Sequence, residues 1–165
     1  MLKVGCNVNN LFRAKTTKKE NENHGFNNVW VYGDLLTNKG VHYIHPQNNV
    51  FRLDGELAKI LIAHEVLSET IGRFFGLTDK NGTKIFEGDF LKYKLKERIN
   101  DVYIYGHVVY NQDTCEFVVS SIVEEFIIPD KDFFNDIEDI EVIGNIYDNP
   151  ELLGEQYGKR KSERD

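Results

Sequence analysis

The chain has 165 residues, 41% of them hydrophobic, which is enough apolar content for a packed core in one domain or two small subdomains. Its formal net charge of −7 disfavours non-specific binding to DNA or anionic membranes, because such contacts need clustered cations. No apolar run is long enough to span a membrane and the N-terminus does not resemble a signal peptide, so we expect a cytoplasmic protein with two reduced cysteines, Cys6 and Cys115.

The N-terminal part of the chain predicts short strands separated by polar turns. The 11 Phe and 8 Tyr favour strands over helices, because flat side chains pack well on a pleated surface. From the order of apolar and polar residues we predict a strand centred on residues 11–13, a loop over 15–25, a strand over 29–33 that breaks at Gly33-Asp34, and a strand over 41–44 that ends before Pro46.

The segment from Leu57 to Leu67 fits two kinds of secondary structure. Its apolar residues recur with helical spacing from Leu57 to His64, and they also alternate from Ile60 to Val66. Intrinsic preference favours a helix, while the alternation favours a strand. The pattern by itself leaves both open.

From Ile71 onward the turns are clearly marked. Asn81-Gly82 is a strong hairpin signal and predicts a type I′ turn, in which both central residues have positive φ. Gly88-Asp89 predicts a bend in which the glycine takes an unusual backbone angle and the aspartate caps free amide groups. We therefore expect a chain reversal at each of these two points.

No metal or catalytic motif is complete. The run that starts at Asp79 resembles a calcium loop, but its sixth and twelfth positions are Lys84 and Phe90 instead of Gly and Glu. His42 and His45 are three residues apart in a strand-like segment, which places them on opposite faces and disfavours a shared metal. The chain contains no phosphate-binding glycine loop and no nucleophile elbow. We therefore expect no cofactor, no metal and no enzymatic activity.

A basic row beside an aromatic row is the most distinctive surface pattern. Residues 90–97 alternate between apolar side chains on one face and lysines on the other. Residues 102–110 alternate between aliphatic side chains on one face and Tyr103, Tyr105 and His107 on the other, so we expect His107 at the surface. Small β-barrels use such rows to bind single-stranded nucleic acid. The alternative, which the net charge favours, is a solvated face whose lysines discourage edge-to-edge pairing. The candidate ligand face consists of Lys92, Lys94, Lys96, Tyr103 and Tyr105.

The C-terminal part predicts two further strands around an acidic segment. We expect a turn at 111–113, a strand over 116–121, and a last strand over 141–147 that is stopped by Asn149-Pro150 and followed by one helical turn at 151–153. Residues 124–141 hold eight carboxylates against one lysine, Lys131. They form either a solvated loop or a docking segment for a basic partner. Three aromatic residues in this segment are core anchors or part of a self-association surface: Phe126, Phe133 and Phe134.

Four stretches of the sequence closely resemble the YopX family, small proteins of bacteriophages, prophages and their bacterial hosts: FR at 12–13, WVYG at 30–33, ETIGRFFGLTDKNGTKIFEGD at 69–89 and EVIGNIYDNPEL at 141–152. The resemblance implies a mainly β fold with little helix, in which an SH3-like barrel over 71–153 packs with a β-rich N-terminal subdomain over 1–70. The tail over 154–165 is charged and has Tyr157 as its only large apolar side chain, so we expect it to be disordered. The resemblance favours a strand from about Ile60. It also implies structural turn positions in the hallmark run, at Asp79, Asn81, Gly82, Gly88 and Asp89.

The resemblance implies that the protein comes from a bacteriophage, a prophage or its bacterial host. It implies no biochemical role, because the family has none assigned. We therefore expect a non-enzymatic binding or assembly module that contacts an unknown protein partner or forms a homo-oligomer. The alternative is a protein that associates with single-stranded nucleic acid through the lysine row at Lys92, Lys94 and Lys96.

Overall fold

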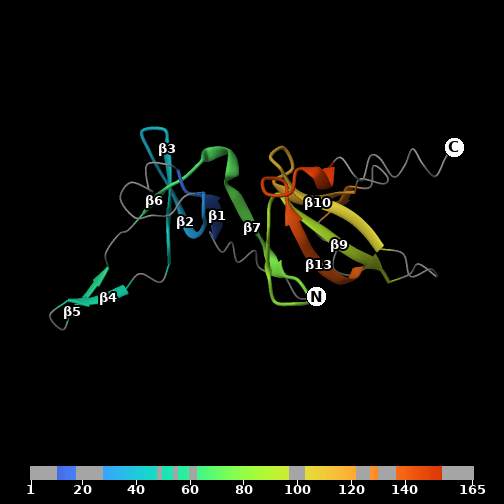
Figure 1. Cartoon of the computed structure of the whole chain (residues 1–165), viewed down its shortest axis with the longest axis horizontal. Helices are drawn as coiled ribbons and strands as arrows, with labels where there is room; N and C mark the ends of the chain where they lie inside the picture. The colour runs from blue at the N-terminus through green and yellow to red at the C-terminus, as the bar shows by residue number, and fades with distance from the viewer. Residues whose placement is uncertain are drawn as a thin grey trace. The chain divides into compact units, whose positions relative to one another are not determined.

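A computed structural model describes residues 11–17, 28–47, 50–53, 56–59, 63–96, 103–121, 127–129 and 137–153, and the chain divides into two compact units, Met1–Phe74 and Phe75–Asp165. The described residues are mainly strand, with a short 3-10 helix, η1, at Ser68–Thr70 and one helical turn at 151–153 (Figure 1). The predicted mainly β fold with little helix is therefore confirmed. The predicted subdomain limits stay a prediction, and the predicted disordered tail lies outside the described residues.

The first unit is built on an antiparallel sheet with the hydrogen-bonded order β6-β3-β2-β1, followed by the start of β7. Ala14, Ile44 and Val66 form its buried core. Strands β4 and β5 pair only with each other among the described strands. The bounds are β1 Phe12–Lys15, β2 Trp30–Asn38, β3 Val41–His45, β4 Val50–Leu53, β5 Glu56–Lys59, β6 His64–Glu65 and β7 Gly72–Thr78.

Strand β2 does not break at Gly33-Asp34, as the sequence suggested, but continues to Asn38. The reason is a change of partner, because Gly33 pairs with Phe12 of β1 and Asp34 pairs with His45 of β3. A β-carbon at Gly33 would lie only 1.9 Å from the backbone oxygen of His45. Only a residue without a side chain permits this close approach, so the glycine sustains the strand here.

Two further predictions in the first unit can be compared with the structure. The predicted loop over 15–25 is wrong at its start, because Lys15 ends β1 and Thr16 forms a bridge with Val66; residues 18–25 lie outside the described part. In the ambiguous segment, residues 57–59 and 64–65 are strand and none of its described residues is helical, while residues 60–62 lie outside the description. Pairing with β4 and β3 gives these residues the extended conformation despite their helical preference.

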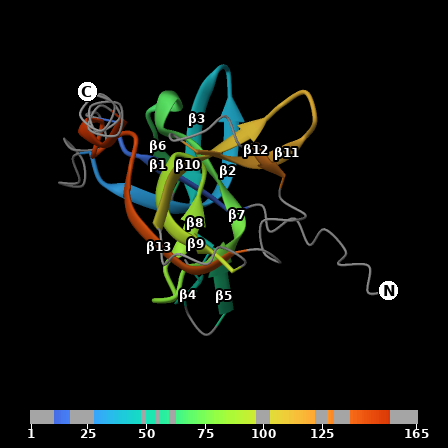
Figure 2. The same ribbon diagram turned by 90° about the vertical axis from the view of Figure 1, so that its right-hand side faces the viewer.

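The second unit contains a five-stranded antiparallel sheet in the order β12-β11-β10-β9-β13, and the last residues of β7 pair with β8 (Figure 2). The apolar residues of β9 alternate as predicted, and its inward-facing Leu91 and Tyr93 are fully buried. The SH3-like barrel stays a prediction. The bounds are β8 Lys84–Phe86, β9 Asp89–Leu95, β10 Tyr103–Asn111, β11 Glu116–Ser121, β12 Ile127–Pro129 and β13 Ile137–Asn145, and the buried core is Phe75, Ile85, Leu91, Tyr93, Val108, Val119 and Ile137.

The turn between β7 and β8 is not the predicted type I′ turn. Gly82 has a positive φ of 82° and Asn81 does not. The backbone N–H of Gly82 donates to the carbonyl of Asp79 at 3.0 Å and that of Asp79 donates to Thr83 at 2.8 Å, which is the pattern of a type I turn followed by a glycine bulge. Two consecutive positive φ values, 49° and 79°, occur instead at Lys39-Gly40 between β2 and β3.

The second predicted bend is confirmed at Gly88-Asp89. Gly88 has a φ of 83°, and the Asp89 carboxylate accepts a 2.8 Å hydrogen bond from the backbone N–H of Phe86. Asp89 is completely buried, so its carboxylate belongs to the interior of the second unit. Its predicted role as a capping residue is therefore the observed one.

The last strand is shifted toward the N-terminus of its predicted range. Strand β13 starts at Ile137 because it pairs with β9 from Leu95 to Asp89. It ends at Asn145, whose side-chain oxygen accepts hydrogen bonds from the backbone N–H groups of Tyr147 and Asp148 and turns the chain. The predicted acidic segment is described only at 127–129 and from 137 onward, so its three phenylalanines lie outside the described residues.

Candidate functional site

The predicted lysine and tyrosine rows meet on one face of the second unit, and β13 adds a third row. Lys94 pairs with Tyr103 of β10 on one side and with Glu138 of β13 on the other. Lys92 lies in the same way between Tyr105 and Glu141. Directly paired residues share a face of the sheet. We call this surface the polar face and define it as Lys80, Lys92, Lys94, Tyr103, Tyr105, Glu138, Asp139 and Glu141; Lys96 is exposed in the turn after β9.

Tyr103 is the centre of the contacts on the polar face. The ammonium groups of Lys92 and Lys94 lie 4.1 Å and 4.7 Å from its ring centroid, within the range of cation–π attraction. Its hydroxyl donates a 2.8 Å hydrogen bond to Asp139. The ring is therefore already in contact with two cations of its own chain, whereas nucleic-acid binding would need an open aromatic surface for base stacking.

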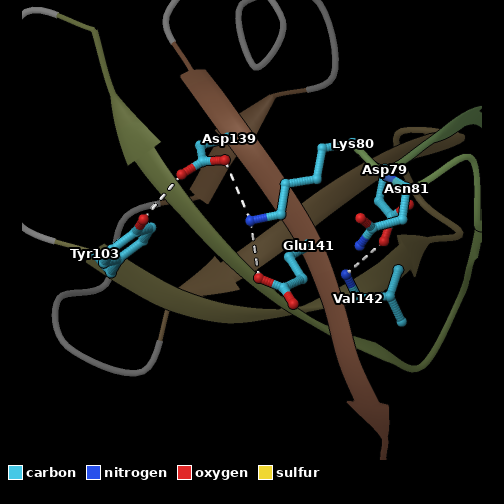
Figure 3. Close-up of polar contacts among 7 residues, drawn as sticks. All are labelled: Asp79, Lys80, Asn81, Tyr103, Asp139, Glu141 and Val142. Atoms are coloured by element: carbon cyan, nitrogen blue, oxygen red, sulfur yellow. Dashed lines mark hydrogen bonds and ion pairs between the residues drawn. The ribbon is translucent and has the colours of Figure 1, made fainter.

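A bulge in β13 places Asp139 between Tyr103 and Lys80. The register shifts between Glu138 and Glu141, and Asp139 has a φ of 59°. Figure 3 shows the Lys80 ammonium between two carboxylates, 3.2 Å from Asp139 and 3.0 Å from Glu141. These hydrogen bonds to Glu141 and Asp139 raise the pKa of Lys80, and those from Tyr103 and Lys80 lower the pKa of Asp139. Both groups are therefore charged at neutral pH.

Charges on the polar face cancel. The polar face contains three lysines, Lys80, Lys92 and Lys94. It contains the same number of carboxylates, all from β13: Glu138, Asp139 and Glu141. Binding to a phosphate backbone depends on cations that are not already neutralised. The sequence analysis missed this compensation because β13 is more than forty residues from β9 along the chain. The available signal was the acidic end of the predicted last strand.

This compensation gives a prediction for nucleic-acid binding. We expect the wild-type chain to show no salt-dependent retention on single-stranded DNA at low ionic strength. Replacing Glu138 and Glu141 with lysine should create retention that falls steeply with salt, because counterion release then drives binding. If wild type is retained and Lys92→Glu, Lys94→Glu and Lys96→Glu together abolish that retention, the nucleic-acid alternative is correct.

Asp79 holds the β7–β8 turn against β13. One of its carboxylate oxygens accepts 2.8 Å hydrogen bonds from the backbone N–H groups of Asn81 and Thr83. The other accepts a 3.1 Å hydrogen bond from the backbone N–H of Val142 (Figure 3). The backbone N–H of Lys80 donates to Ile140 of β13 at 2.9 Å. Burial raises the pKa of Asp79, but the hydrogen bonds from Val142, Thr83 and Asn81 outweigh it, and the net pKa is lowered.

The histidines and the described cysteine are dispersed. His42 hydrogen-bonds Ser68 at 2.8 Å, and His45 is buried. His107 is half-buried beside Phe90, not at the surface as expected, and burial lowers its pKa. Cys115 is exposed in the β10–β11 turn. Among the residues that the structure describes, no three His, Cys, Asp or Glu side chains are grouped so that they could hold a metal ion.

A second surface, on the first unit, was not predicted. Among the described residues, the exposed large apolar side chains are Val29, Tyr32, Leu36 and Val41, which are 36–47% exposed and all belong to β2, β3 or the residue before them. We call these four residues the hairpin patch.

The strand period explains the exposure of Tyr32 and Leu36. Val31 and Leu35 pack against the core, so Tyr32 and Leu36, each one residue later, face the other way. Trp30 lies beside them on β2, with the Arg13 guanidinium 4.6 Å and the Lys15 ammonium 5.3 Å from its ring. The apolar alternation in WVYGDLL was the available signal, but the sequence does not tell which of the two faces is covered.

Comparison with known proteins identifies one family. The family model described as YopX protein matches residues 11–154. No curated protein matches the chain. Within the described residues, no helix has the length and apolar character needed to cross a membrane.

Proposed function

Because the chain belongs to the YopX family, we propose that it is a non-enzymatic binding module of phage or prophage origin that works in the bacterial cytoplasm by contact with another protein. The family has no assigned biochemical role, so the support for this proposal comes from the surface of the molecule. The observation that carries it is the hairpin patch.

All four large apolar side chains that are exposed among the described residues fall within residues 29–41. The centre of a protein interface is enriched in tyrosine, tryptophan and arginine and depleted in lysine and glutamate. The polar face has the opposite composition, with lysine and glutamate paired across strands. The hairpin patch is therefore the better candidate for partner contact.

Replacing Tyr32 and Leu36 with serine should abolish partner capture. Loss of a central interface side chain typically costs about 2 kcal/mol or more, so two such losses weaken binding by roughly a thousandfold. The measurement is capture from the cytosol of phage-carrying bacteria on immobilised full-length protein. Thr37→Ala, at an exposed position of the same strand, is the matched control. Equal capture by the double variant and by wild type would contradict the proposal.

A further inference from the structure

Asn81-Gly82 is the single Asn-Gly pair of the chain. In such a pair the backbone nitrogen of the glycine can reach the side-chain amide of the asparagine without crowding, because glycine has no β-carbon. Both residues are exposed, and a β-carbon placed on Gly82 would meet no described atom within 4 Å, so water reaches this pair. The pair is therefore chemically suited to spontaneous deamidation.

Deamidation at this pair needs only water as a co-reactant. The backbone nitrogen of Gly82 loses its proton and attacks the side-chain carbonyl carbon of Asn81. A carbon–nitrogen bond forms, and the amide nitrogen of the side chain leaves as ammonia and takes up the proton. Water then opens the resulting cyclic imide at either carbonyl carbon. One opening gives aspartate, and the other gives isoaspartate, in which the backbone runs through the β-carbon.

The folded turn withholds the attacking nitrogen. The backbone N–H of Gly82 donates to the carbonyl of Asp79 at 3.0 Å, so its proton is engaged within the turn. The backbone on both sides of Gly82 is fixed as well, because the Asp79 carboxylate accepts 2.8 Å hydrogen bonds from the N–H groups of Asn81 and Thr83. The nitrogen of Gly82 therefore has to leave its hydrogen bond before it can attack.

We propose that Asn81 is a deamidation site whose rate is set by opening of the turn that Asp79 holds. Two contacts fasten this turn to β13: the Asp79 carboxylate accepts a 3.1 Å hydrogen bond from Val142, and the backbone N–H of Lys80 donates to Ile140 at 2.9 Å. Local opening breaks such contacts in a small fraction of the molecules at any time. The reaction occurs in that fraction, so its rate measures how often the turn opens.

The product of the reaction opposes closure of the turn. The new carboxylate belongs to the residue whose backbone nitrogen is 2.8 Å from the Asp79 carboxylate, and like charges so close together repel. Isoaspartate also adds a carbon atom to the backbone between the N–H groups of residues 81 and 82, so these groups no longer match their acceptors on Asp79. Deamidation therefore makes a transient opening permanent and weakens the contact of the β7–β8 turn with β13.

Peptide mapping of the full-length protein by liquid chromatography and mass spectrometry measures aspartate and isoaspartate at position 81 during incubation at mildly alkaline pH. Folded wild type should convert slowly, and the same chain in urea should convert fast. Folded Asp79→Ala should convert at least about tenfold faster than folded wild type, because the loss of even one hydrogen bond to a charged group raises the open population by about that factor. Lys80→Ala, which keeps the backbone bonds of the turn, is the matched control and should convert at the wild-type rate.

Two results would overturn the proposal. One is an equal rate for folded and unfolded wild type, since the turn then gives no protection, and the other is an unchanged rate in folded Asp79→Ala. If circular dichroism shows that Asp79→Ala is unfolded, Asp79→Asn takes its place. Its amide oxygen can replace only one of the two carboxylate acceptors, so it should still speed the reaction. Neither result bears on the proposed function, which partner capture tests separately.

Discussion

Replacing Asp79 with alanine should lower the free energy of unfolding by about 3 kcal/mol, since hydrogen bonds to a charged group contribute roughly 1.5–3 kcal/mol each and are not additive. The side chain is 6% exposed and accepts hydrogen bonds from Asn81, Thr83 and Val142. Its removal leaves these backbone N–H groups without their acceptor and frees the β7–β8 turn from β13. Chemical denaturation followed by circular dichroism measures the loss.

Lys80→Ala is the matched control for the Asp79 variant. Lys80 is the next residue and its ammonium bridges two carboxylates, but the pair is exposed to solvent and exposed ion pairs contribute little. Its backbone bond to Ile140 survives the substitution. We therefore expect a much smaller change than for Asp79→Ala. Equal losses for the two variants would show that the ion pair, and not the carboxylate of Asp79, holds the turn.

The contribution of Asp79 should also depend on pH. Hydrogen bonding keeps the pKa of its carboxyl below the ordinary value of 3.8 in the folded protein. The unfolded chain therefore takes up its proton first as the pH falls, so the stabilisation is complete above about pH 4 and is lost below it. In Asp79→Asn the amide oxygen can replace one of the two carboxylate acceptors, the N–H₂ group only donates, and the side chain does not titrate. The stability difference between wild type and this variant should be constant near neutrality and shrink toward pH 3.

Replacing Gly33 with alanine should destabilise the first unit by about 3 kcal/mol, at the upper end of the usual range for overpacking. The new β-carbon would lie 1.9 Å from the His45 carbonyl oxygen and 2.9 Å from the α-carbon of Pro46. Both are backbone atoms, which cannot move aside as a flexible side chain does. Relief of the clash requires separation of β2 from β3, where the strand changes partner.

Trp30 provides the measurement for the Gly33 variant. It is the single tryptophan of the chain and lies on β2, three residues from the substitution, so its fluorescence reports unfolding of this unit. Thr37→Ala, at an exposed position of the same strand, should leave the midpoint nearly unchanged. An unchanged midpoint for Gly33→Ala would mean that β2 and β3 can separate at this point without loss of stability.

The resemblance of short motifs and the alternation of residues were sufficient for the fold class and for most strands. They placed Lys92 and Lys94 opposite the buried Leu91 and Tyr93 correctly, because alternation is a local property of an extended chain. They also gave the capping role of Asp89, since a carboxylate beside a glycine bend finds its partner within three residues.

Local patterns failed where a distant strand decided the outcome. The β7–β8 turn took another type because Asp79 fixes the backbone at Asn81 and Thr83 and is itself fixed by Val142, sixty-three residues away. Strand β2 continued through Gly33 because two different strands pair with its two halves. Each of these outcomes depends on which segments pair in the fold, and the short-range sequence pattern does not specify this pairing.

The properties of the surfaces were likewise determined partly by the local sequence and partly by the tertiary structure. The sequence by itself determined that this protein is a β protein of the YopX family and which of its side chains share a strand face. Only the tertiary structure decided that β13 neutralises the lysine row and that Val29, Tyr32, Leu36 and Val41 remain exposed. The physical reason is that alternation sorts side chains onto two faces of a strand, whereas the charge and the exposure of each face are set by the elements that pack beside it.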